Sequence, residues 1–205
     1  MNIWKRNKPS ISFEFYPAQT EKGTARLKDV ISELLTLSPD FMSVTFGAGG
    51  SSRKGSLELL QHLRKKSDIH LTGYLAAYGL GREELADIAG RYQAEGVNAL
   101  LAVRGDIPQD NPLPPHPLGC PHAADLVRLM RRNINIPVGV AAYPEGHVET
   151  DSREKDWSRL LEKISCGAEF IITQYFYDNR DFFTLRDFLL KHDIKIPILA
   201  GIMPI

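Results

Sequence analysis

Short apolar segments alternate along the whole chain with longer segments of helical periodicity. The apolar segments are rich in β-branched and aromatic residues and stop at glycine, proline or polar residues, as strands do. They predict strands at Ser10–Tyr16, Phe41–Gly47, His70–Leu75, Ala99–Arg104, Pro137–Tyr143, Phe170–Tyr177 and Pro197–Met203. The intervening segments repeat apolar residues at helical spacing, which predicts helices at Thr24–Leu37, Ser56–Lys66, Arg82–Glu95, Ala123–Arg132, Trp157–Ser165 and Asp181–Lys191. Such alternation indicates parallel strands joined by right-handed crossovers.

The alternation leaves a choice between an open doubly wound sheet and a barrel. An open sheet usually has a glycine-rich turn after its first strand, and none follows Tyr16. Seven evenly spaced units are one short of the eight that close a barrel. The chain also stops in the apolar segment Leu199–Ile205, whereas a native C-terminus seldom lies inside a core element. We therefore expect an α/β fold: an incomplete TIM (β/α)8 barrel, one partial domain over residues 1–205, with its last strand and helices missing.

Composition and charge narrow the classes of partner. The chain has 205 residues, enough for one domain with a large core. Lys+Arg and Asp+Glu balance at 25 each, so no basic excess indicates a nucleic-acid or membrane partner. No apolar segment has the length of a transmembrane helix, and the first residues lack a signal-peptide pattern. Cys120 and Cys166 lack metal-ligand spacing. We expect a cytoplasmic protein that acts on a small molecule.

Residues able to do chemistry follow the predicted strands. In a parallel β/α barrel the carboxyl ends of the strands open onto one face, where active sites are built. These ends read Phe13–Phe15, Val44–Gly47, His70–Thr72, Arg104–Asp106, Tyr143–Glu145 and Thr173–Gln174. Polar side chains that are scattered in the sequence are therefore expected to meet at one site.

Glu14 is the leading candidate for acid–base chemistry. Because strand side chains alternate between faces, Ser12, Glu14 and Tyr16 should share the barrel interior. Burial disfavours the charged form of a carboxyl group, so the pKa of Glu14 should rise and suit it to donate a proton. The alternative is a structural glutamate bonded by a neighbouring hydroxyl, such as that of Ser12 or Thr45.

Other strand ends offer groups for binding an anion or a flat ring. Gly47–Ser52 could bind an anion, although it matches neither the dinucleotide fingerprint nor a Walker loop and also fits a flexible connection. Arg104 can grip a phosphate or carboxylate at two points, and Gly105 lets a flat ligand approach the backbone. Asp106 can accept hydrogen bonds from a ring system. An internal ion pair between Arg104 and Asp106 is the alternative.

Candidates also follow the fifth predicted strand. Tyr143, Glu145 and His147 cluster there, and a catalytic metal is not expected because no histidine pair has metal-ligand spacing. Asp156, Arg159 and Lys163 lie three and four residues apart and share a helix face. That face is either a solvated charged stripe or a clamp on a pyrophosphate at the barrel rim.

Taken together, these motifs resemble the methylenetetrahydrofolate reductase family over nearly the whole chain. The resemblance rests on six motifs in order: Ser12–Pro17, Ser43–Ala48, His70–Thr72, Arg104–Asp106, Ala141–His147, and Gly167–Ala168 with Thr173–Phe176. It implies a barrel that binds FAD without a Rossmann fold, takes hydride from NADH or NADPH, and then passes it to methylenetetrahydrofolate to give methyltetrahydrofolate. The cofactor carries the hydride chemistry, and the protein positions and protonates.

The resemblance also implies individual roles. Glu14 is similar to the acid that protonates the folate, and Asp106 to a residue near the flavin pyrimidine edge that also touches the pterin. Gln174 resembles a glutamine that contacts nicotinamide and folate, and Thr45 a hydroxyl on the nicotinamide side. The positions that match FAD contacts are Phe46, Ala48, His70, Arg104, Gly105, Asp106, Ala123, Tyr143, His147, Asp156, Arg159 and Lys163.

The chain departs from the family pattern in several places. Gly73–Arg82 is longer than the expected loop, and Glu162 stands where many members have a basic residue. The folate-gripping residues of the last strands and helices have no counterpart. Two alternatives therefore stay open, an inactive truncated barrel and a flavin-free barrel that binds pterins. The full-length protein is expected to be a homo-oligomer.

Overall fold

Seven parallel strands form one curled sheet in the computed structural model, which describes residues 9–46, 50–107 and 114–203. The strands are β1 (Ser12–Phe15), β2 (Phe41–Val44), β3 (His70–Ala76), β4 (Ala99–Val103), β5 (Val138–Ala142), β6 (Phe170–Tyr175) and β7 (Ile198–Gly201). They pair in sequence order, so β1 and β7 form the two edges of the sheet. This arrangement confirms the incomplete β/α barrel.

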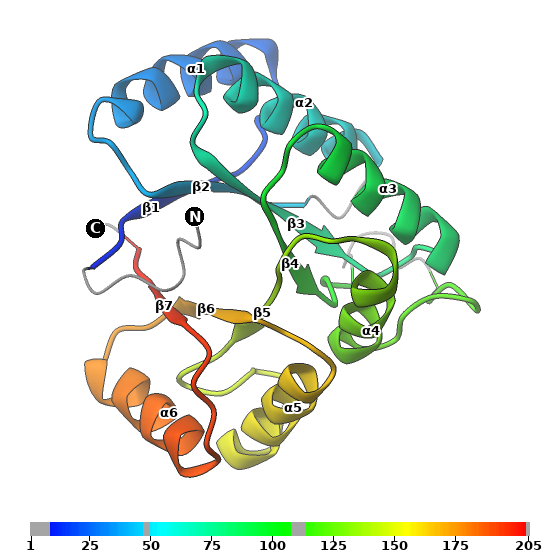
Figure 1. The fold of residues 1–205 in the computed structure, drawn as a ribbon, viewed down its shortest axis with the longest axis vertical. Helices are drawn as coiled ribbons and strands as arrows, with labels where there is room; N and C mark the ends of the chain where they lie inside the picture. The colour runs from blue at the N-terminus through cyan, green and yellow to red at the C-terminus, as the bar shows by residue number, and fades with distance from the viewer. Residues whose placement is uncertain (1–8, 47–49, 108–113, 204–205) are drawn as a thin grey trace.

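Six helices alternate with the strands and lie on the outside of the curl (Figure 1). They are α1 (Glu21–Leu35), α2 (Gly50–Lys66), α3 (Arg82–Ala94), α4 (Ala123–Asn133), α5 (Arg153–Ser165) and α6 (Asn179–Lys191). The helix-outside, sheet-inside order is what right-handed crossovers between parallel strands produce.

Several predicted boundaries were wrong, because polar first turns carry no hydrophobic periodicity. Helix α5 begins at Arg153 rather than Trp157, and its start is fixed by the Ser152 hydroxyl, which accepts a hydrogen bond of 3.2 Å from the Lys155 amide. Helix α2 begins at Gly50 rather than Ser56. The expected anion loop Gly47–Ser52 therefore belongs in part to a helix, and Gly47–Gly49 lies outside the described residues.

Two apolar clusters hold the sheet in place. The larger one lies between the outward side chains of the strands and the helices. The smaller one lies inside the curl, where Ala99, Leu101 and Phe170 pack with Tyr74. Gly139 of β5 makes room for the Phe170 ring, since a Cβ there would lie 2.2 Å from Phe170 Cε2. The inner cluster fills the barrel below the carboxyl ends and leaves the space above them for a site.

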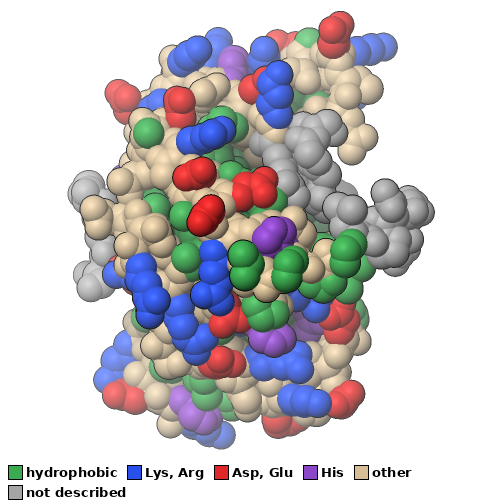
Figure 2. Space-filling model, turned by 90° about the vertical axis from the view of Figure 1, so that its right-hand side faces the viewer, with side chains coloured by type: hydrophobic (Ala, Val, Ile, Leu, Met, Phe, Trp, Pro, Cys, Tyr) green, Lys and Arg blue, Asp and Glu red, His purple; other side chains and the backbone are tan. Residues whose placement is uncertain are grey.

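The surface carries charges of both signs. Figure 2 shows basic and acidic side chains interspersed over one face of the molecule, as the balance of 25 and 25 suggests. Within the described part of the chain, no helix is both long and apolar enough to span a membrane.

Candidate active site

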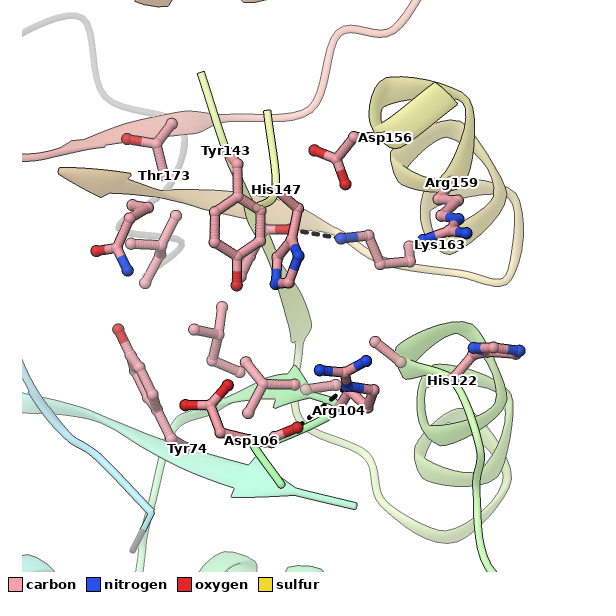
Figure 3. Close-up of a pocket in the computed structure, with 18 of the residues that line it drawn as sticks. Tyr74, Arg104, Asp106, His122, Tyr143, His147, Asp156, Arg159, Lys163 and Thr173 are labelled. Atoms are coloured by element: carbon pink, nitrogen blue, oxygen red, sulfur yellow. Dashed lines mark hydrogen bonds between the residues drawn. The ribbon is translucent and has the colours of Figure 1, made fainter. Parts of the chain in front are cut away.

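A cavity of about 450 Å³ opens among residues at the carboxyl ends of the strands and the starts of α4 and α5. Its size is typical of small-molecule sites. In Figure 3 side chains from different elements point into one shared space. The predicted site residues that line it are Glu14, Thr45, Arg104, Gly105, Asp106, Ala123, Tyr143, His147, Asp156, Arg159, Lys163 and Gln174. The predicted convergence of distant polar residues on one rim is therefore confirmed.

Three predicted residues are not among those that line the cavity. His70 begins β3, pairing in register with Phe41 at the start of β2, so its expected place at a strand's carboxyl end was wrong. The predicted strand His70–Leu75 continues by one residue to Ala76, so its carboxyl end lies at Ala76 and not at Thr72. Phe46 packs against the outer apolar cluster. Ala48 lies outside the described residues.

Glu14 lies inside the curl on the edge strand β1, opposite Ser43 in the sheet register. Its carboxylate accepts a hydrogen bond from the Tyr74 hydroxyl. Part of the side chain remains open to solvent, but the protein atoms around the carboxyl group raise its pKa by desolvation, while the Tyr74 hydrogen bond lowers it. The bonding hydroxyl is thus that of Tyr74 rather than that of Ser12 or Thr45. The raised pKa fits a proton donor.

Arg104 and Gly105 shape the rim after β4. Gly105 adopts φ +84°, and a Cβ there would lie 2.9 Å from that of Ala76, so glycine suits this close turn. The Arg104 guanidinium donates two hydrogen bonds to the Glu149 carboxylate, at 2.6 and 2.9 Å. This pairing lowers the pKa of Glu149. The alternative of an internal pair with Asp106 was wrong, because the ion-pair partner is Glu149.

Helix α5 presents charged groups to the cavity. Asp156 is 9% exposed, and Lys163 Nζ donates a 2.6 Å hydrogen bond to the Ala141 carbonyl oxygen of β5. Desolvation lowers the pKa of Lys163 to about 8, partly opposed by Asp156. Arg159 remains exposed between them. The alternative of a fully solvated stripe therefore does not hold for Asp156 and Lys163.

The start of α4 faces the same space. His122, Ala123 and Ala124 line the cavity at the N-terminus of this helix. The first backbone N–H groups of a helix lack intrahelical partners, and the helix dipole favours negative charge there. Together with Lys163 and Arg159, this end of the cavity suits a phosphate group.

Tyr143 and His147 lie across the cavity from Tyr74 and Asp106 (Figure 3). Their rings meet edge to face, with centroids 4.6 Å apart. Burial raises the pKa of Tyr143, and the Asp106 carboxylate adds to this effect. The Tyr143 carbonyl accepts a 3.0 Å hydrogen bond from the Trp157 indole, which ties this loop to α5.

Strand β6 contributes an amide at the cavity rim. Gln174 lines the cavity, and its side-chain oxygen accepts a 3.1 Å hydrogen bond from the Tyr175 amide. Thr173 accepts a 2.9 Å hydrogen bond from the Gly201 amide of β7. This bond fixes β7 beside β6 at the level of the site.

Sequence reasoning missed two residues that matter to the geometry. Tyr74 could have been found from the alternation of β3, since it shares a face with His70 and Thr72. Glu149 lies in an irregular loop, so no periodicity points to it. Within the described ranges, no group of three or more His, Cys, Asp or Glu side chains could hold a metal ion.

The fold and cavity define a β/α-barrel protein with an acid on one side of its carboxyl-end cavity and cations on the other. Comparison with known proteins names the family. The model of the methylenetetrahydrofolate reductase family matches residues 1–205, and the chain belongs to this family.

Named relatives agree with the family. The 5,10-methylenetetrahydrofolate reductase of Pectobacterium carotovorum is 34% identical over 96% of this chain and 64% of its own length. The enzyme of the same name from Escherichia coli is 32% identical over the same shares. The chain therefore spans less than two thirds of these relatives.

Solved structures support the fold alone. A Clostridium thermocellum protein, described as binding two copies of 5-methyl-5,6,7,8-tetrahydrofolic acid, superposes with a TM-score of 0.65 at 16% identity, over 97% of this chain and 67% of its own. A 2,3-dimethylmalate lyase superposes with a TM-score of 0.66 at 11% identity, over 96% and 66%.

Proposed function

We propose that this chain carries the cofactor site and the proton-donating site of a methylenetetrahydrofolate reductase. The reaction is the reduction of 5,10-methylenetetrahydrofolate to 5-methyltetrahydrofolate by NADH or NADPH, through bound FAD, in a ping-pong sequence. The observation that supports it most is the meeting of Glu14, Asp106 and Gln174 with a cationic helix face in one cavity, in a chain of this family.

The residues present fit FAD. Lys163, Arg159 and the N-terminus of α4 supply positive charge for the diphosphate, as anion sites at helix ends do. Tyr143, His147 and Gly105 offer ring faces and a close backbone for flat groups. When bound, FAD accepts hydride from the reduced nicotinamide and supplies it to the folate.

The chain's own residues position the reactants and move one proton. Glu14, with its raised pKa, holds a proton and gives it to the bridging nitrogen of the folate, which opens the ring to an electrophilic iminium. Asp106 accepts hydrogen bonds from the pterin, while its negative charge favours hydride donation by the reduced cofactor. Gln174 contacts nicotinamide and folate in turn, and the Thr45 hydroxyl binds on the nicotinamide side.

The test is the visible absorbance of bound flavin and its change when substrates are added. The purified chain is incubated with FAD, freed of excess by gel filtration, and examined for flavin absorbance. We expect retained flavin that is bleached by NADH or NADPH and restored by methylenetetrahydrofolate. A colourless protein that still binds folate would favour the flavin-free alternative, and one that binds neither would favour an inactive barrel. The cytoplasmic location and the homo-oligomeric state stay predictions.

A further inference from the structure

Tyr74 occupies an unusual place in the barrel interior. It lies on β3 and packs against Ala99, Leu101 and Phe170 of the inner cluster. Its hydroxyl nevertheless reaches Glu14 on β1, which is two strands away in the sheet. Neighbouring strands are about 4.8 Å apart, so the side chains of Tyr74 and Glu14 together span about 10 Å.

The strand between them permits this crossing. Ser43 of β2 is paired with Glu14 on one side and with Thr72 on the other. Ser43 is buried, and its hydroxyl hydrogen-bonds the Tyr74 phenol. A small polar residue at this position thus lets the tyrosine ring pass over β2 and also anchors its oxygen.

We propose that Tyr74 is the positioning residue of the Glu14 acid, holding one carboxyl oxygen through its hydroxyl and leaving the other free to face the folate. This inference rests on the proposed function for the role of Glu14, but the hydrogen bond itself does not. The rigid setting supports it, because the ring is packed by the inner cluster and its oxygen is held by Ser43.

The arrangement affects each state of the acid differently. A phenol that donates to a carboxylate stabilises the charged form, so it favours the state in which the proton has passed from Glu14 to the folate nitrogen. Tyr74 keeps its own proton throughout, since desolvation and the Glu14 charge raise the pKa of the phenol. Burial and Tyr74 thus oppose one another in setting the pKa of Glu14.

Few other titratable groups face this pair. Tyr16 follows β1 and is 71% exposed; desolvation raises the pKa of its phenol, and Coulombic interactions with Glu14 and with Tyr175 of β6 add to this effect. Asp106 lines the same cavity. Tyr16 is therefore the matched control: a phenol near Glu14 for which no hydrogen bond to Glu14 is found.

The test is the carboxyl pKa of Glu14, read by 13C NMR in the 23.0 kDa chain labelled at the glutamate side-chain carboxyl carbons. The Glu14 signal is identified by its loss in Glu14→Gln. Because the hydrogen bond from Tyr74 stabilises the charged carboxylate, its loss in Tyr74→Phe should raise the pKa of Glu14 by about one pH unit. Tyr16→Phe should leave the pKa of Glu14 unchanged, because the Tyr16 phenol is uncharged in the range where Glu14 titrates. An unchanged pKa in Tyr74→Phe, or an equal rise in both variants, would overturn the proposal.

A second measurement needs no substitution of Tyr74. With tyrosine labelled at Cζ, the Tyr74 signal should move at the titration midpoint of Glu14 and lose this response in Glu14→Gln. If the Tyr74 signal did not move in this coupled way, the result would contradict the proposal, even if Tyr74→Phe failed to fold. Where folate turnover is measurable, Tyr74→Phe should raise the apparent pKa in the pH profile of the folate half-reaction by the same amount. The rate of flavin reduction should not change. Failure of turnover alone would refute the proposed function and leave the NMR result standing.

Discussion

The two sides of the cavity differ in how they obtain their chemistry. On the proton side, Glu14 of β1, Thr45 directly after β2 and Tyr74 of β3 supply one acid and two hydroxyls. On the cation side, formed by Arg159, Lys163 and the start of α4, helices outside the sheet supply the positive charge. The strands therefore hold a single proton donor in place by packing and hydrogen bonding. The helix N-terminus and the long basic side chains instead place positive charge where an anionic group of a ligand would bind.

The largest effect is expected for Glu14→Gln, which should impair the proton side of the cavity and leave the cation side intact. Glu14→Gln removes the proton but keeps the shape and the Tyr74 contact. General acid catalysis typically contributes about 10²–10⁴-fold, so reoxidation of the reduced flavin by methylenetetrahydrofolate should slow by that order. Stopped-flow absorbance should show flavin reduction by NADH or NADPH within about twofold of the wild type.

Glu21→Gln is the matched control for this variant, since Glu21 lies in the exposed first turn of α1. It should change neither half-reaction. Equal losses in both half-reactions of Glu14→Gln would contradict a role confined to the proton side.

The pH dependence of FAD affinity should sharpen the assignment of the cation side. Lys163 has a pKa lowered to about 8, so it is mostly charged at pH 7 and mostly neutral at pH 9. Loss of this charge should weaken FAD binding by about fivefold to tenfold over that interval. Fluorescence titration of FAD at each pH measures the change, which should vanish in Lys163→Met. A persisting change in that variant would assign the effect to another group.

A smaller effect is expected at Asp106, which lies between the two sides. Asp106→Asn removes a negative charge without changing the size of the side chain. Interaction of about 1 kcal/mol between Asp106 and the reduced ring corresponds to about 20 mV for a two-electron couple, so the flavin potential should rise by about that amount. Dye-linked equilibration measures it. An unchanged potential would remove Asp106 from the flavin edge.

The sequence predicted the fold well because the outward strand residues and the helix faces have regular periods. All seven strands and six helices appear, and errors lie at polar helix starts such as Arg153. It predicted the cavity because strand ends in this architecture share one face. The same logic failed for His70, because His70–Thr72 was taken for the carboxyl end of a strand that it begins.

Partners of the site residues were beyond the reach of the sequence. Arg104 pairs with Glu149 from a loop, and Glu14 with Tyr74 from two strands away. Such contacts depend on the tertiary placement of side chains distant in sequence, which no local period encodes.

The FAD dissociation constant, measured side by side for two variants, tests the division of the cavity most directly. Lys163→Met keeps the apolar stem but removes the charge and the bond to Ala141. Lys155→Met is its control on the same helix, because Lys155 is exposed and pairs with Asp151. We predict that Lys163→Met weakens FAD binding at least tenfold, as about 1.4 kcal/mol of charge-assisted bonding requires, with Lys155→Met and Glu14→Gln unchanged. Weaker binding in Glu14→Gln with unchanged binding in Lys163→Met would contradict the account.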